Sequence, residues 1–458
     1  MRKQRYLEEI LQRPPISMQQ ILDAREQRVQ RQNRMMKLQE GTLVSFTLNI
    51  AGAVKAAPLF SRAFAEGKRR ILSQLQYSGI SVLLQEESSG ETGEELYLLT
   101  NGQPMQIKRL MCQIEDGFPM GRLFDIDVMA RGVPKVSRSD LHVSPRKCLI
   151  CDQMAAACAR SQQHSIRQLL EKTVELICDY FEESDAEEIA QAACRALLYE
   201  VSVTPKPGLV DRQNNGSHRD MDLFCFVDSA CVLYPYFRAC TKMGMKEELS
   251  PQQLFESLRP LGKDAEERMY RMTGGVNTHK GAIFSMGIFC AAAGRLSEQP
   301  FSVEKMGELC KQMCAHLLDD FAGIAGKQEL SYGEKLYLRY GVTGIRGEAA
   351  QGFPSVLDCG YPMLLNALQA GKSLNDAGVQ VLLALVVRVQ DTNILARSDP
   401  DTLRWAQQSV RKVLEEGVDL EQVRALDQAF IQRRISPGGC ADLLALCFFL
   451  HFLQLHNE

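Results

Sequence analysis

Two aspartates separated by one residue stand in the segment Gly121-Arg-Leu-Phe-Asp-Ile-Asp-Val128. If this segment is a β-strand, Asp125 and Asp127 share one face, because successive side chains alternate between the faces. Two neighbouring carboxylates repel each other unless a cation is close, and Mg²⁺ bound by carboxylates and substrate phosphates is a common solution. The pattern therefore predicts a magnesium site with Arg122 beside it, although an edge strand with two solvated aspartates has the same spacing.

Arginines follow this segment. Arg138, Arg146 and Arg160 carry guanidinium groups whose geometry matches phosphate oxygens. They predict either a clamp for a polyphosphate or a solvated basic surface.

The same stretch holds four side chains that are typical zinc ligands. Cys148 and Cys151 form a Cys-x-x-Cys pair, and Cys158 and His164 follow it. Together they could form a zinc site of three cysteines and one histidine. The irregular spacing of Cys158 and His164 in an alanine-rich stretch favours buried free thiols instead.

A long polar loop begins with Thr204-Pro-Lys-Pro-Gly-Leu-Val-Asp-Arg212 and ends at Asp222. Its prolines and glycines restrict the backbone, while many polar side chains crowd into a short span. The candidate functional residues are Lys206, Asp211, Arg212, Asn214, His218 and Asp220. A connecting loop seldom needs so many functional groups, so we expect them to bind or act on a substrate.

A second loop, residues 274–281, leads directly into an apolar helix. Asn277 or Thr278 falls near the N-cap, and His279 and Lys280 fall on the first turn. A lysine there opposes the helix dipole unless an anion is bound, so the loop predicts a phosphate cradle rather than a simple helix start. The residue order differs from a Walker A loop.

Later loops add further polar groups. Arg346 and Glu348 lie in one, Asp391 and Asn393 in the next, and the segment 436–442 opens the last helix. If the helices form a bundle, loops at the same end of the bundle would bring carboxylates together around metal-bound phosphates. The expected acids are Asp211, Asp220, Glu348 and Asp391. No Ser-His-Asp order or His-Glu-x-x-His helix is present, so hydrolase templates are not supported.

The elements that position these residues change character along the chain. Residues 4–40 have helical spacing on both sides of Pro14-Pro15, which predicts two short helices. Short apolar runs separated by turn residues then predict a mixed α+β domain. The runs cover residues 43–50, 80–84, 95–100, 105–115 and 122–129. After His164 long helical segments dominate, so we predict an α+β domain over residues 1–165 and an all-α domain over 166–458.

The composition is that of an ordinary globular protein. At roughly 150 residues per domain, 458 residues predict two or three domains. Hydrophobic residues at 45% and charged residues at 24% exclude disordered and fibrous classes. The net charge of −3 leaves no global basic field to attract nucleic acid or an anionic membrane surface.

The sequence predicts a cytoplasmic protein. The first nine residues are charged and lack the apolar core of a secretory signal. The apolar stretches 281–294, 379–387 and 440–455 are shorter than the roughly 20 residues needed to span a bilayer, so we expect buried helices. Without an export signal, the 15 cysteines are expected to be free thiols.

Several ordered motifs resemble two known families. The N-terminal third resembles the apo-citrate lyase phosphoribosyl-dephospho-coenzyme A transferase family, also called citrate lyase holo-acyl-carrier-protein synthase. This likeness rests on Leu43-Val-Ser-Phe-Thr-Leu-Asn-Ile50, the segment 121–128 and Pro145-Arg-Lys-Cys-Leu-Ile-Cys151. The remainder resembles the triphosphoribosyl-dephospho-coenzyme A synthase family. That likeness rests on the segments 204–212, 275–281, 347–350, 391–393 and 436–439.

The two resemblances cover nearly the whole chain and imply a natural fusion of both activities. One departure lies at Ala396-Arg-Ser-Asp399, where His-Arg-Gly-Gly is expected after the Asp-Thr-Asn motif. The implied fold is a nucleotidyltransferase-like α+β domain followed by a large all-α domain.

The resemblance implies a two-step route to the citrate lyase prosthetic group. In the helical domain, a ribose hydroxyl of 3'-dephospho-CoA would displace adenine from C1 of the ATP ribose, with the triphosphate retained. The N-terminal domain would then transfer the phosphoribosyl-dephospho-CoA unit to a serine of the citrate lyase acyl carrier protein and release pyrophosphate. The implied substrates are ATP and 3'-dephospho-CoA, and the expected cofactor is Mg²⁺.

Roles follow from this chemistry as hypotheses. Asp125 and Asp127 with Mg²⁺ would activate the serine, whereas Asp220 and Asp391 would hold metal in the helical domain. Asp211 or Asp220 would stabilise the ribosyl cation, and His218 or His279 would protonate the departing adenine. The alternatives are a non-catalytic carrier-protein chaperone with a degenerate nucleotide pocket and a nucleotide phosphohydrolase.

Overall fold

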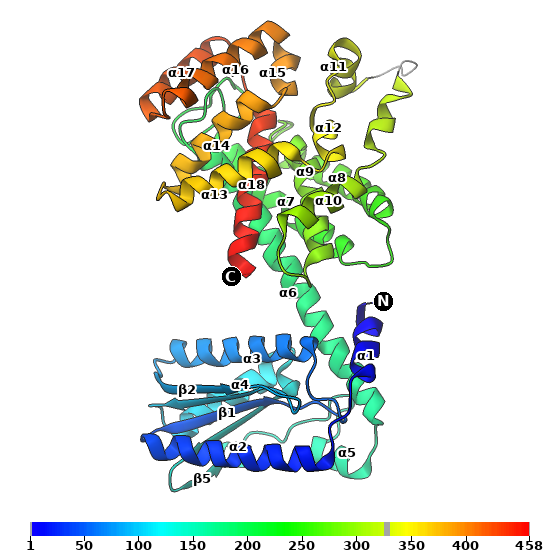
Figure 1. Ribbon diagram of the computed structural model, residues 1–458, viewed down its shortest axis with the longest axis vertical. Coiled ribbons are helices and arrows are strands. Elements are labelled where there is room, and N and C mark those ends of the chain that lie inside the picture. Colours follow the sequence, from blue (N-terminus) through cyan, green and yellow to red (C-terminus); the bar gives the residue numbers. More distant parts are fainter. Residues whose placement is uncertain (1, 325–329, 458) are drawn as a thin grey trace. The chain divides into compact units, whose positions relative to one another are not determined.

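The computed structural model describes residues 2–324 and 330–457, and these residues form two compact units (Figure 1). Unit 1 comprises Met1–Phe181 and unit 2 comprises Glu182–Glu458. Helix α6, Ile166–Ser202, contributes residues to both units. The sequence predicted a boundary near residue 165, just before α6, whereas the two compact units divide after Phe181, within this helix. An unbroken helix gives no change of sequence pattern at that point.

Unit 1 is built on a five-stranded antiparallel sheet with the strand order β2-β3-β1-β4-β5. The strands are β1 (Thr42–Leu48), β2 (Val82–Ser88), β3 (Glu95–Thr100), β4 (Phe124–Ala130) and β5 (Val133–Val136). The helical elements are α1 (Arg2–Gln12), α2 (Met18–Leu38), α3 (Pro58–Tyr77), α4 (Pro104–Gly117), η1 (Gly121–Leu123), η2 (Ser139–Leu141) and α5 (Ala155–Ser161).

Helices cover both faces of this sheet (Figure 1). On one face, Phe46 of β1 and Ile126 of β4 belong to the main core of unit 1, to which α3 and α4 contribute. On the other face, Leu43 and Tyr97 pack with Met35 of α2. Alternation along β1 and β3 therefore supplies apolar side chains to both faces of the sheet.

The mixed α+β architecture predicted for the N-terminal part is confirmed. The two helices around Pro14-Pro15 are α1 and α2, and α2 begins with a capping box formed by Ser17 and Gln20. Among the apolar runs of the sequence, residues 105–115 form the helix α4. Its buried Ile107, Met111 and Ile114 repeat at three- and four-residue intervals, which is the period of an amphipathic helix.

The described part of unit 2 consists of helices and the loops that connect them, without a strand. After α6 come α7 (Leu223–Gly244), α8 (Pro251–Met272), α9 (Lys280–Leu296), α10 (Val303–Met313), η3 (Leu317–Phe321), α11 (Tyr332–Tyr340) and α12 (Gly344–Ala350). The remaining elements are the π-helix η5 (Val356–Gly360), α13 (Tyr361–Gln369), α14 (Leu374–Arg388), α15 (Thr392–Arg397), α16 (Pro400–Glu415), α17 (Leu420–Gln432) and α18 (Gly438–Asn457).

The three apolar stretches expected to be buried helices form the centre of unit 2. They correspond to α9, α14 and α18, whose apolar side chains belong to one hydrophobic core. By length and composition alone, α7 and α18 could cross a membrane. This is weak evidence, since core helices pass the same test, and α18 is mostly buried inside unit 2.

Candidate active sites

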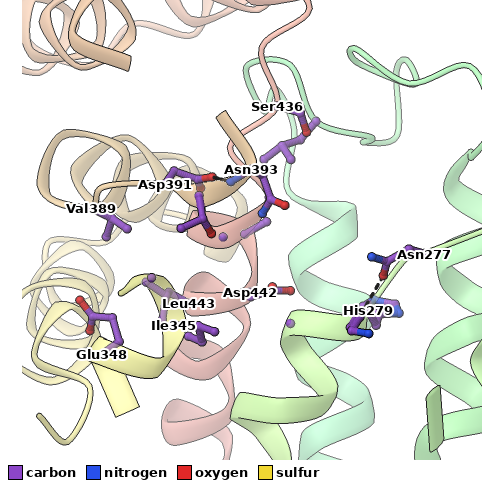
Figure 2. A pocket seen from close by; sticks show the side chains of 18 of the residues that line it. Asn277, His279, Ile345, Glu348, Val389, Asp391, Asn393, Ser436, Asp442 and Leu443 are labelled. Carbon is purple, nitrogen blue, oxygen red and sulfur yellow. Dashed lines mark hydrogen bonds between the residues drawn. The ribbon is translucent and has the colours of Figure 1, made fainter. Parts of the chain in front are cut away.

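A cavity of about 670 Å³ lies within unit 2. Its wall is formed by the polar loop after α6 and by the segments that open four later helices, α9, α12, α15 and α18. Figure 2 shows side chains from these segments around one space. The sequence-predicted residues that line it are Lys206, His218, Asp220, Asn277, Thr278, His279, Lys280, Glu348, Asp391 and Asn393.

Two long helices, α9 and α18, begin at the cavity wall. The first N–H groups of a helix have no intrahelical partner, and the helix dipole makes this end attractive to anions. His279 occupies the N-cap of α9 without a side-chain capping bond, while Asn277 accepts from the amide of Lys280 at 3.2 Å. These two helix starts are the parts of the cavity wall whose polarity suits a phosphate group.

Asp391 joins two of the helix starts. Its Oδ1 accepts from the amide of Asn393 at 2.7 Å, and its Oδ2 accepts from the amide of Cys440 at 2.9 Å. Burial raises the pKa of Asp391, and these amide hydrogen bonds oppose the increase. A Cβ on Gly439 would lie 3.0 Å from Oδ2, so a glycine lets α18 approach this carboxylate closely.

Asp442 lies between the two sides of the cavity. Figure 2 shows it on α18, with His279 of the α9 start on one side and Asp391 on the other. A Cβ on Gly281 would lie 2.0 Å from its Oδ2, so the carboxylate packs directly against the first turn of α9. Burial and the negative charges of Glu200 and Asp391 raise the pKa of Asp442 well above its usual value.

A buried ion pair forms part of the cavity lining. Lys206 Nζ lies 2.5 Å from Glu200 Oε1, and only 2% of the lysine side chain is exposed. Burial raises the pKa of Glu200, and the charge of Lys206 opposes this effect. Because two opposite charges are held out of water, the pair fixes the polar loop to α6.

His279 carries an unpartnered ring nitrogen. Its Nδ1 lies 2.7 Å from Ser229 Oγ, and its buried Nε2 has no hydrogen-bond partner among the described residues. Burial and the charge of Lys206 lower its pKa to about 3. The imidazole is therefore neutral near pH 7 and has one nitrogen left for a ligand.

His218 and Asp220 lie together on the polar loop. His218 Nε2 lies 2.8 Å from Ser436 Oγ, and Nδ1 lies 3.9 Å from Asp220 Oδ1. Burial and the charge of Arg397 lower the pKa of His218, whereas the charge of Asp220 raises it. A bound anion would also raise this pKa, because it would favour the imidazolium form.

Asp211, Arg212 and Asn214 hold the loop instead of lining the cavity. Asp211 accepts from the amides of Lys206, Gln213 and Asn214. Arg212 donates to Thr204 and Asn375, and Asn214 donates to Asp427 of α17. The crowded polar sequence thus partly reflects a loop that satisfies its own backbone, which its composition could not distinguish from a binding role.

Two further predicted residues have protein partners. Arg346 lies outside the lining and stacks over Phe321 at 5.1 Å. Lys280 does line the cavity, but its Nζ lies 2.8 Å from Glu266 Oε2 on α8.

Sequence reasoning missed several lining residues. Glu200 lies inside a long helix without any loop signal, and Asp442 follows the noted Ser-Pro-Gly-Gly motif without being singled out. Arg388 and Arg397 also line the cavity, and Arg397 lies within the segment that departs from the expected His-Arg-Gly-Gly. For Arg397, the available sequence signal was its place at the arginine of the expected His-Arg-Gly-Gly motif.

In unit 1, Asp125 and Asp127 share one face of β4, as the alternation predicted. They stand opposite Thr47 and Ser45 of β1 in the sheet register. Lys135 Nζ lies 2.5 Å from Asp127 Oδ1, so protein cations already approach this face.

Two of the three predicted arginines converge beside these aspartates, whereas Arg160 is exposed on α5 and donates to the carbonyl of Ala156. Arg138 and Arg146 both pair with the buried carboxylate of Glu115, and Arg146 Nη1 also lies 3.9 Å from Asp125 Oδ1. Arg122 Nε is buried and has no hydrogen-bond partner among the described residues. Burial and the charges of Arg146 and Arg138 lower the pKa of Arg122. This cluster is a partly neutralised basic site rather than an open clamp.

The sulfur-rich stretch also forms a cluster. Cys148, Cys151, Cys158 and His164 lie together in unit 1, and all 15 cysteines of the chain are free.

Two family models match the chain. Residues 186–458 match CitG, ATP:dephospho-CoA triphosphoribosyl transferase, and residues 16–180 match CitX, apo-citrate lyase phosphoribosyl-dephospho-CoA transferase. The chain is 35% identical to Protein CitXG of Haemophilus influenzae, with 95% of this chain and 96% of the relative covered. It is 31% identical to Protein CitXG of Leuconostoc mesenteroides subsp. cremoris, with 95% and 97% covered.

A relative of the helical unit alone is the 2-(5''-triphosphoribosyl)-3'-dephosphocoenzyme-A synthase of Klebsiella pneumoniae. The two are 41% identical, with 58% of this chain and 90% of the relative covered.

Proposed function

Because this chain belongs to the CitXG family, we propose that the cavity of unit 2 and the Asp125–Asp127 face of unit 1 are the sites of its two transferase activities. The chain is a bifunctional enzyme that combines triphosphoribosyl-dephospho-CoA synthase with citrate lyase holo-acyl-carrier-protein synthase. The first activity joins ATP to 3'-dephospho-CoA with loss of adenine. The second attaches the phosphoribosyl-dephospho-CoA unit to a serine of the citrate lyase acyl carrier protein with loss of pyrophosphate. The cytoplasmic location stays a prediction.

The cavity of unit 2 is the observation that supports assigning the synthase activity to this unit. It lies wholly among segments of the part of the chain that matches the synthase, and the starts of α9 and α18 provide amides for phosphate oxygens. The triphosphate of ATP lies at these helix starts, so that the ribose extends toward the polar loop carrying His218 and Asp220.

Charge in the cavity supports a requirement for Mg²⁺. Its acidic residues are Glu200, Asp220, Glu348, Asp391 and Asp442, and its lysines and arginines are Lys206, Lys280, Arg388 and Arg397. A triphosphate would add negative charge to a site where acids already outnumber bases. Carboxylate oxygens suit a hard cation, so Asp220 and Asp391, with Asp442 between the walls, would hold Mg²⁺ against the phosphates. The metal would neutralise the triphosphate.

The reacting groups are assigned from their positions. Asp220 lines the cavity, whereas Asp211 accepts three amides of its own loop, so Asp220 is the carboxylate for the developing ribosyl cation. His218 protonates adenine as it leaves, because the bound triphosphate raises its pKa. His279 stays neutral, and its Nε2 hydrogen-bonds to the substrate.

In unit 1, Asp125 and Asp127 would hold Mg²⁺ beside the pyrophosphate leaving group, on a domain that acts like a nucleotidyltransferase. Arg122 contributes a buried donor, and Arg146 lies between Glu115 and Asp125. With Mg²⁺ bound, the aspartates would lower the cost of deprotonating the acceptor serine.

Two readouts test the assignments in one incubation of the protein with ATP, Mg²⁺, 3'-dephospho-CoA and the citrate lyase acyl carrier protein. Adenine is measured by chromatography, and the serine adduct is measured by mass spectrometry. We expect both products. Carrier-protein binding without either product would favour a chaperone, and phosphate release without 3'-dephospho-CoA would favour a phosphohydrolase.

Variants then separate the residues. Asp220→Asn should lower adenine release on the order of 10²-fold. Asp228→Asn, which changes an exposed carboxylate on α7, should not lower it.

The double variant Asp125→Asn with Asp127→Asn should lose carrier-protein labelling and keep adenine release. Wild-type labelling by that double variant would remove the metal role from this face.

A further inference from the structure

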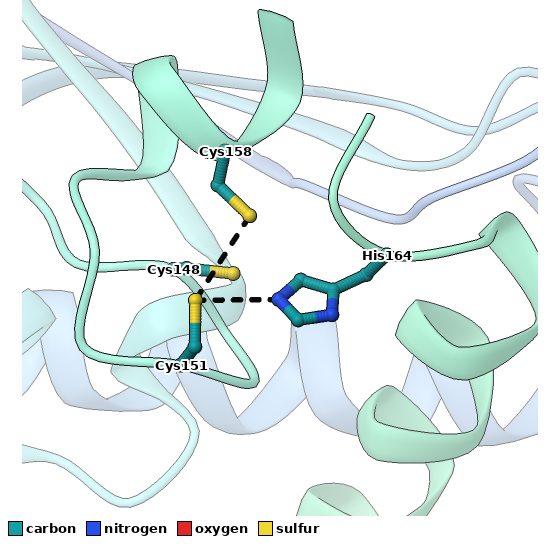
Figure 3. A group of neighbouring side chains, drawn as sticks. All are labelled: Cys148, Cys151, Cys158 and His164. Carbon is teal, nitrogen blue, oxygen red and sulfur yellow. Dashed lines mark hydrogen bonds between the residues drawn. The ribbon is translucent and has the colours of Figure 1, made fainter. Parts of the chain in front are cut away.

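Four potential metal ligands converge outside both proposed active sites. Cys148 and Cys151 lie in the turn before α5, Cys158 lies on α5, and His164 lies between α5 and α6. Figure 3 shows their sulfur and nitrogen atoms directed toward one point. All four ligand atoms lie within 4.8 Å of one another.

The spacing matches a tetrahedral metal site. With Zn–S bonds of about 2.3 Å and Zn–N bonds of about 2.0 Å, ligand atoms of a tetrahedron lie roughly 3.5 to 3.8 Å apart. Cys151 Sγ lies 4.0 Å from Cys158 Sγ and 3.2 Å from His164 Nε2, so the observed distances bracket these values. A disulfide requires about 2.05 Å between sulfurs, so Cys151 and Cys158 are not bonded.

The local backbone is shaped around the sulfur atoms. Lys147 and Met154 form an isolated antiparallel bridge that closes the turn, and the amide of Cys148 donates to Gln153 O at 2.7 Å. The amide of Ile150 points to Cys148 Sγ at 3.5 Å, which favours a thiolate there. At the end of α5, Gln162 adopts a left-handed φ of 49°, which lets the chain turn toward His164.

Apolar packing contributes little to holding the four candidate ligands together. Ile150 and Met154 are 40% and 57% exposed, and of the four candidate ligands only Cys158 is buried. A short segment with so little core needs another source of folding free energy, and structural zinc commonly supplies it.

We propose that Cys148, Cys151, Cys158 and His164 bind one structural zinc ion. Three thiolates and one imidazole complete a tetrahedron, which leaves no open position for catalysis. The soft sulfur ligands favour zinc over the Mg²⁺ proposed for the transferase sites. This inference goes beyond both transferase activities and does not depend on either.

The ion would position the basic side of the unit 1 site. Arg146, two residues before Cys148, pairs with Glu115 and approaches Asp125. The carbonyl of Lys147 accepts from Arg122. Loss of zinc should therefore impair carrier-protein labelling and leave adenine release in unit 2 unchanged.

The first test measures metal in the full-length wild-type protein, purified without chelators, by mass spectrometry of the elements. We expect about one zinc per chain, released by a mercurial thiol reagent and detected with a chromogenic chelator. Protein produced in cells supplied with cobalt should show thiolate-to-cobalt absorption bands. This experiment needs no variant, so a folding defect cannot obscure it.

The second test compares Cys151→Ser with Cys231→Ser, which changes an exposed cysteine on α7. Cys151→Ser should lose most of the zinc, whereas Cys231→Ser should retain it. Adenine release by each variant reports whether unit 2 is folded. A wild-type chain that has substoichiometric zinc and takes up none when zinc is added would overturn the proposal, as would iron in this site or a disulfide among these cysteines.

Discussion

At the scale of single residues, His279 shows how burial sets a protonation state. Its imidazole is almost completely enclosed, and together with the charge of Lys206 this lowers its pKa to about 3. In the unfolded chain the same side chain should titrate near its ordinary pKa of roughly 6.5. At a pH between these two pKa values, the unfolded state binds one more proton at this residue than the folded state does. His279 therefore lowers the stability of the fold as the pH falls.

We predict that His279→Gln reduces the acid sensitivity of unit 2, because the amide cannot titrate. For this residue alone, the wild type should lose about 2 kcal/mol of unfolding free energy between pH 7 and pH 5 relative to the variant. Urea unfolding of both proteins at the two pH values measures this difference. Equal losses in both proteins would show that the imidazole is protonated in the folded state.

The same variant should release adenine more slowly, on the order of 10-fold or more, because Gln places its polar atoms differently from Nε2. Wild-type adenine release by His279→Gln would remove His279 from the substrate contacts.

Asp442 makes stability depend on pH in the opposite direction. Its pKa is raised by burial and by the charges of Glu200 and Asp391. Above the ordinary pKa of an aspartate, the unfolded chain therefore releases a proton that the folded state keeps, and stability falls as the pH rises. Below that pH the carboxyl is protonated in both states and the cost disappears. A carboxylate retained at such a cost is typical of a functional site.

We therefore predict that Asp442→Asn makes the ligand-free protein more stable near pH 7, by about 1 kcal/mol, and slows adenine release by roughly 10-fold or more. The gain in stability should vanish near pH 4. Thermal unfolding at both pH values and the adenine assay provide the readouts, with the exposed Asp401→Asn as control. A variant that is less stable near pH 7 would contradict the assigned pKa direction.

At the scale of elements, the polar loop of residues 204–222 depends on α17. Asp427 accepts from the amide of Gly208 at 2.8 Å and from Asn214 Nδ2 at 2.9 Å. Gly208 has a φ of 71°, and a Cβ there would lie 2.1 Å from Ile435 O, so only glycine fits. Asp427 is therefore a positioning residue for a loop whose His218 and Asp220 face the cavity.

We predict that Asp427→Ala destabilises unit 2 by about 1 to 3 kcal/mol, because it leaves buried donors without an acceptor. The loosened loop should raise the KM for ATP more than it lowers kcat. Gln428→Ala, on the exposed side of the same helix, is the matched control. Steady-state kinetics with unchanged KM would indicate that the loop is held by its own hydrogen bonds.

At the scale of the whole molecule, the chain contains two compact units, each with its own hydrophobic core and its own candidate site. The described cavity belongs entirely to unit 2, and the Asp125–Asp127 face belongs entirely to unit 1.

We predict that two inactive variants complement each other. Asp220→Asn keeps the unit 1 site, and the double variant Asp125→Asn with Asp127→Asn keeps the unit 2 site. Their mixture should label the carrier protein with ATP and 3'-dephospho-CoA, because the triphosphoribosyl intermediate can diffuse between chains. If the mixture fails while added intermediate restores labelling by Asp220→Asn, transfer must occur within one chain.

The sequence by itself predicted the α+β and all-α parts, the shared face of Asp125 and Asp127, and the loops that meet at the cavity. These features depend on local periodicity and on motif order, which neighbouring residues along the chain determine. The apolar run at residues 105–115 was not assigned to helix or strand from the sequence, because a short apolar run fits either period; it forms α4.

Only the tertiary structure decided which polar residues face the cavity and which hold the loop. Asp211 and Asp220 look alike in sequence, yet one accepts amides of its own loop and the other lines the cavity. Likewise, the irregular spacing from Cys148 to His164 hid a cluster that a turn, a short helix and a left-handed residue bring together. Side-chain direction and long-range approach arise from packing between distant segments, so residue type and spacing alone could not supply them.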